Sequence, residues 1–163
     1  MNSYEIGDYK FEIVKRLISD GEICSLLDPE GRCQYPDDLI YENIFPFARI
    51  PATEQEVKAY ITISVGVPNI DAKNDLIRNL RVSVRAYSHA DIMKVSGSHS
   101  NRVDLISAAI DRIFNESTVL GIGPVRLVAN TEHVYDSAHY YRELLFRTDD
   151  INAKRYGAKQ WDH

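Results

Sequence analysis

The first regular pattern in the chain is helical and lies between about Asp8 and Asp20. Apolar side chains recur there at the spacing that places them on one helix face: Phe11, Val14, Leu17 and Ile18. Asp8 can cap the first turn, and Gly21 can adopt the left-handed conformation that ends a helix. We therefore predict an amphipathic helix here, followed by a short helical turn over 22–27.

Four later segments alternate apolar and polar residues, which is the pattern of strands with one buried face. They cover about 57–66, 80–87, 125–130 and 140–147. Between the second and third segments, a helical stripe of apolar residues extends from Leu105 to Phe114, with Asn101 as its N-cap. Two hairpins separated by a helix predict an α+β fold, in which helices pack on one face of a four-stranded antiparallel sheet.

The segment 28–53 interrupts the regular pattern. Pro36, Pro46 and Pro51 break any long helix or strand, yet the segment is too apolar for a solvated linker. We expect an irregular excursion that packs either on its own domain or on a neighbouring molecule. Residues 1–149, with long loops over 69–79 and 88–100, are expected to form one domain. Residues 150–163 lack periodicity, so we expect a tail that is either flexible or ordered by a partner.

Composition is that of one globular domain. The 163 residues are 44% apolar, and a chain of this length buries about 68–70% of its unfolded surface. The formal net charge of −5 argues against broad nucleic-acid binding, which depends on neutralising phosphates with Lys and Arg. No secretory pattern and no run of about 20 apolar residues is present, so we expect a soluble protein without a membrane partner.

Motifs for catalysis and cofactor binding are incomplete. The Gly121-x-Gly123 pair leads into a strand rather than opening a helix, which excludes a dinucleotide fingerprint. His89, His133 and Asp136 could serve a small enzymatic or ligand-binding domain, but their spacing matches no metal or catalytic motif. We therefore predict a protein that is not an enzyme and uses no metal or cofactor, and keep the small enzymatic or ligand-binding domain as the less favoured alternative.

Aromatic residues gather in the excursion. Tyr and Phe are enriched at protein interfaces, although such side chains can equally close over the domain's own core. Acidic neighbours such as Asp37 and Asp38 disfavour stacking on single-stranded nucleic acid, for which interleaved Lys and Arg are expected. The predicted interface residues are Tyr41, Phe45, Phe47, Arg49, His89, Asp91, Tyr156 and Trp161.

The order of elements over residues 4–149 and several local stretches carry a resemblance to a known family. The stretches are LIYENIFP at 39–46, RIP at 49–51, YITI at 60–63, LRVSV at 80–84, His89, and NRVDLI at 101–106 leading to Ile110. In these features the sequence resembles the tail terminator, or tail-completion, proteins of long-tailed bacteriophages and their prophage relatives.

The resemblance implies a small α+β subunit that forms a hexameric ring on the head-proximal end of the tail tube. Such a ring ends tube polymerisation and joins the tail to the head-side connector or stopper protein. The implied partners are other copies of the chain, the tube protein and, where the tail is contractile, the sheath, while DNA passes through the channel without specific binding. The implied location is the virion neck, after assembly in the host bacterial cytoplasm. Another neck component, such as a head-completion or stopper protein, is the nearest alternative.

Overall fold

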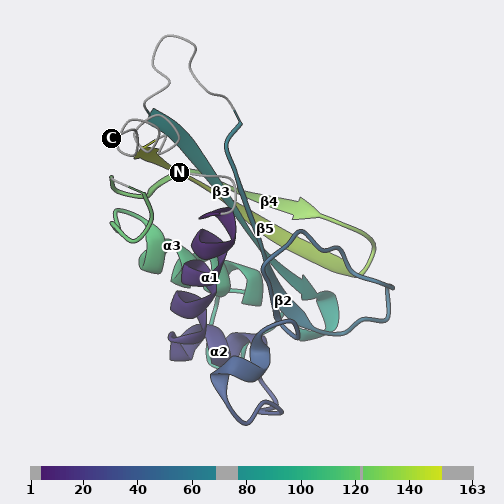
Figure 1. Cartoon of the computed structure of the whole chain (residues 1–163). Helices are drawn as coiled ribbons and strands as arrows, with labels where there is room; N and C mark the ends of the chain where they lie inside the picture. Colours follow the sequence, from purple (N-terminus) through teal and green to yellow (C-terminus); the bar gives the residue numbers. More distant parts are fainter. Residues whose placement is uncertain (1–4, 69–76, 122, 152–163) are drawn as a thin grey trace, which may run out of the picture.

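The computed structural model describes residues 5–68, 77–121 and 123–151, and its helices gather on one side of a twisted sheet (Figure 1). The helices are α1 (Glu5–Ile18), α2 (Gly21–Leu27) and α3 (Arg102–Phe114), with short 3₁₀ turns η1 (Pro36–Leu39) and η2 (Ala90–Ile92). The strands are β1 (Ile44–Phe45), β2 (Ala59–Gly66), β3 (Ile77–His89), β4 (Arg126–Val134) and β5 (His139–Ile151). This arrangement confirms the α+β class with helices on one face.

The sheet has five strands in the order β1-β2-β3-β5-β4 and is mixed, so the prediction of four antiparallel strands was wrong. Four strands pair antiparallel, but β1, inside the excursion, pairs parallel to β2 with Ile44 opposite Ile61. The Asn43 amide fixes this pairing, because it donates to the carbonyls of Leu27 and Ala59 at 3.2 and 2.7 Å. A strand of two residues is too short to produce an alternating pattern, which is why the sequence did not reveal it.

Three strands extend beyond their predicted ends, and β4 continues to Val134 rather than ending near residue 130. Residues 77–79 belong to β3 rather than to the expected loop, and the rest of that loop, over 69–76, lies outside the described residues. The other long strand, β5, continues to Ile151 because Asp149 and Asp150 pair with Asn79 and Arg78 of β3. Polar side chains occupy both strands at this end, so the alternation that marks a half-buried strand is absent there.

Capping residues begin α2 and α3, but two capping predictions for α1 were wrong, because Asp8 lies inside α1 and Gly21 begins α2 without a left-handed conformation. The Asn101 side chain accepts a hydrogen bond from the Asp104 N–H at 2.9 Å and begins α3, as predicted. In the same way, Asp20 accepts from the Ile23 N–H at 3.0 Å and begins α2. The buried face of α1 differs from the predicted apolar stripe. Ile13, which was outside that stripe, is buried, whereas Phe11, which was part of it, is 62% exposed.

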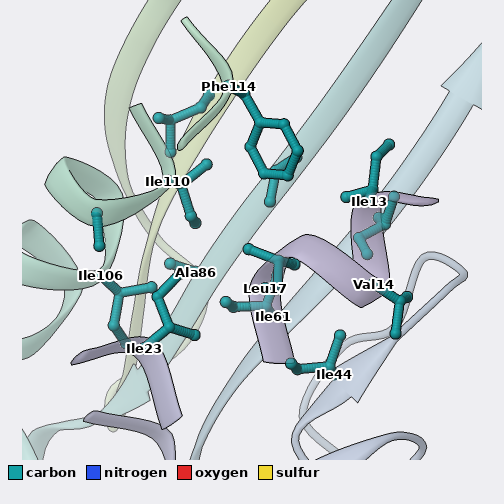
Figure 2. Close-up of a cluster of buried hydrophobic side chains, with 14 of the residues drawn as sticks. Ile13, Val14, Leu17, Ile23, Ile44, Ile61, Ala86, Ile106, Ile110 and Phe114 are labelled. Carbon is teal, nitrogen blue, oxygen red and sulfur yellow. The ribbon is translucent and has the colours of Figure 1, made fainter. Parts of the chain in front are cut away.

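The main core lies between the helices and one face of the sheet. Figure 2 shows side chains of α1, α3 and the sheet meeting in this cluster, with Leu17, Ile61 and Ile110 among them. These three side chains are fully buried, and each contributes about 1.5–3 kcal/mol through removal of apolar surface from water. Within the described part of the chain, no helix is long and apolar enough to cross a membrane.

Candidate functional site

A row of aromatic side chains crosses the sheet on the face opposite the helices. Tyr60, Tyr87, Tyr141 and His133 lie directly opposite one another on β2, β3, β5 and β4. Their rings stack in sequence, with centroid distances of 4.8, 4.6 and 4.8 Å. Phe45 of β1 extends the row with an edge-to-face contact to Tyr60 at 5.7 Å. This aromatic row therefore ties all five strands together from side to side.

The end of the excursion covers one end of the aromatic row. The Arg49 guanidinium lies 4.6 Å from the Phe45 ring centroid and 4.8 Å from that of Tyr60. Its Nη2 donates to Glu56 Oε1 at 2.5 Å, and the Ala52 N–H donates to the other carboxylate oxygen at 2.7 Å. Burial raises the pKa of Glu56, but the Ala52 N–H and the Arg49 cation outweigh burial and hold that pKa below its usual value.

Two buried histidines fasten the same segment to the sheet. The rings of His89, at the end of β3, and His139, at the start of β5, meet edge to face at 5.0 Å. His89 Nε2 lies 3.0 Å from the Glu54 carbonyl oxygen, and His139 Nε2 lies 2.9 Å from that of Glu56. His139 Nδ1 faces Asp136 Oδ1 at 3.0 Å. The histidine pair is thus a structural anchor for the chain that follows the excursion.

The residues considered for a catalytic site have different partners. Asp136 contacts His139, whereas His133 stacks on Tyr141 in the aromatic row. Sequence reasoning missed the pairing of His89 with His139, because it depends on the register of β3 and β5. Over residues 5–68, 77–121 and 123–151, no group of three or more His, Cys, Asp and Glu side chains could hold a metal ion.

Some of the predicted interface residues are exposed and others are buried. Tyr41 and Phe47 are exposed and contact each other with ring centroids 6.2 Å apart, and Asp91 is also exposed. Phe45 and His89 are each only 6% exposed, so they hold the protein's own fold together, as Arg49 does. Tyr156 and Trp161 lie outside the described residues.

An apolar hollow of about 440 Å³ separates α1 from the excursion. The residues that line it include Gly7, Lys10, Phe11, Ile40, Tyr41 and Pro46. Phe11 and Tyr41 are 62% and 63% exposed, which is unusual for side chains of this size beside a core. Tyr41 has a φ of 64°, a left-handed conformation that a non-glycine residue rarely adopts. The excursion thus presents an aromatic surface beside α1.

A second exposed surface lies at the opposite edge of the sheet. Strand β4 is outermost in the order and, within the described chain, pairs only with β5. Val128 and Val134 on this strand are both about two-thirds exposed. An outer strand offers unpaired backbone groups to another chain, so this edge is a second candidate for protein–protein contact.

A family model described as YomW matches residues 20–148, from the residue before α2 to near the end of β5. The matched span includes the aromatic row, the histidine pair and the whole excursion. No curated protein matches the chain.

Proposed function

Because the chain belongs to the YomW family, which is associated with phages and prophages, we propose that it is a structural protein of the phage particle. In the finer form of this proposal it is a tail terminator, acting as a homo-oligomeric ring of six copies at the head-proximal end of the tail tube. The ring ends tube polymerisation and presents its other face to the head-side connector. The observation that carries the proposal is the family match, and the sequence resemblance supplies the finer assignment.

Two exposed surfaces of the subunit support assembly into an oligomer rather than a monomeric state. A closed ring needs two unlike surfaces on each subunit, which meet head to tail around the axis. The aromatic surface of Phe11, Tyr41 and Phe47 and the open edge of β4 are two such surfaces on different elements. The net charge of −5 suits a ring beside DNA, because an acidic channel wall repels the phosphate backbone and lets it pass.

The test is an assay of tube ends. Tail tubes from the phage or prophage that encodes the chain are incubated with the purified full chain, and bound protein is located by electron microscopy. We expect binding at one end of each tube, and shorter tubes when the chain is present during tube polymerisation. Tubes that stay free of the chain and polymerise to unchanged lengths would overturn the tail terminator assignment, and binding only to isolated head connectors would favour another neck protein.

A further inference from the structure

The apolar hollow between α1 and the excursion lies on one flank of α1, and the chain end that the structure describes lies on the other. The Tyr9 hydroxyl donates to the carboxylate of Asp150 near the end of β5, so the chain leaves the sheet beside Tyr9. Residues two positions apart on a helix point about 200° apart. Phe11, in the hollow, therefore points away from the place where residues 152–163 begin.

The sequence of residues 152–163 suits the hollow chemically. It carries Tyr156 and Trp161, and its three cationic residues outnumber one Asp, whereas the rest of the chain is strongly acidic. The exposed Asp8 lies one helical turn from Phe11 on the same side of α1, and the exposed Glu42 follows Tyr41. Lys10, which also lines the hollow, offers its cation to the face of an aromatic ring.

We propose that residues 152–163 bind the apolar hollow of a neighbouring copy, with Tyr156 or Trp161 seated against Phe11 and Tyr41. This inference rests on the proposed ring. A segment of this length spans roughly 40 Å when extended, which is ample to reach an adjacent subunit. The described end of β5 and the hollow lie on opposite flanks of α1, so each copy can give its tail to one neighbour and receive the tail of the other.

Trp161 is the only tryptophan of the chain, so its fluorescence reports the contact directly. We expect the emission of the full chain to shift to shorter wavelength as protein concentration rises, in step with the mass measured by light scattering. Phe11→Asp places a charge in the hollow and should abolish both changes. Val57→Asp, a matched change at an exposed residue that belongs to none of the proposed contact surfaces, should leave the emission shift in place.

Complementation separates binding between copies from binding within one copy. A chain ending at Ile151 keeps the hollow and lacks the tail, whereas Phe11→Asp keeps the tail and lacks the hollow. Each variant should give the circular dichroism spectrum of a folded protein and should fail to assemble by itself. A mixture of the two should form a one-to-one complex with blue-shifted Trp161 emission. The absence of this complex would overturn the inference, as would blue-shifted emission that is independent of concentration, which indicates that each tail binds its own hollow.

The failure of this inference and the failure of the proposed function give different results. Rings that form and bind tube ends without residues 152–163 would overturn the tail contact and leave the tail terminator proposal intact. Oligomers that require the tail but never bind tubes would support the contact and contradict the tail terminator proposal.

Discussion

Glu56 joins three parts of the molecule through one residue. Its carboxylate accepts hydrogen bonds from Arg49 and from the Ala52 N–H, while its backbone carbonyl faces the buried His139 ring. Both nitrogens of that ring face oxygen atoms, because Nε2 faces Glu56 O and Nδ1 faces the Asp136 carboxylate. Glu56 is therefore where the excursion, the aromatic row and the histidine pair depend on one another.

Replacing Glu56 with Gln should lower the free energy of unfolding by about 1.5–3 kcal/mol at neutral pH, because a charge-assisted pair of hydrogen bonds is lost. The pKa of Glu56 is lower in the folded chain than in the unfolded one. Its stabilisation is thus fully present above the unfolded value of about 4.3 and disappears as pH falls through the folded value. Urea unfolding of both chains at decreasing pH should show the difference shrinking. A difference that is constant or grows in acid would contradict this, and Glu30→Gln on the exposed surface serves as the control.

Ile110 offers a residue-scale test of the core. Its side chain is fully buried on α3, so Ile110→Asp would bury a carboxylate with no partner, at a cost comparable to the whole stability of a domain. We expect loss of the folded far-ultraviolet circular dichroism spectrum. Val128→Asp makes the same chemical change at an exposed position of β4 and should fold. A soluble, folded Ile110→Asp protein would show that the core is wrongly placed.

At the scale of elements, the aromatic row acts as a side-to-side brace across the strands. A double-mutant cycle of Tyr87→Leu and Tyr141→Leu should give a coupling free energy of about 0.5–1.5 kcal/mol, because these rings stack at 4.6 Å. The matched cycle pairs Tyr87→Leu with Phe114→Leu, which lies among the core residues on the helix-covered face. That pair should be additive within about 0.3–0.5 kcal/mol. Equal coupling in the two cycles would contradict a specific role for the row.

Local sequence patterns locate a helix or strand correctly where its position depends only on nearby residues, such as a capping residue and the apolar stripe that follows it. Asn101 as an N-cap and the apolar stripe after it were sufficient to locate α3. On α1, Phe11 fits the helical spacing but lies outside the buried face, because neighbouring elements decide which part of a broad apolar stripe is covered. The parallel strand β1 depends on the distant Asn43 contacts to Leu27 and Ala59, which no local pattern encodes.

At the scale of the whole molecule, the candidate site was less predictable than the fold. The sequence identified the excursion and its aromatic residues, but it could not decide which of them are exposed. Tyr41 is exposed and Phe45 is buried, although both lie in one short aromatic stretch. The histidine pair and the aromatic row arise from strand register, which brings together residues that are far apart in the chain. Such contacts become visible only when the whole sheet is assembled.

We propose that this chain functions as a ring rather than as a single subunit. The most direct measurement is electron microscopy of the purified full chain, with particle mass determined by light scattering on the same sample. We expect closed rings with a mass of six copies of the chain. A population that remains monomeric at every concentration, and stays monomeric when tail tubes are added, would contradict it.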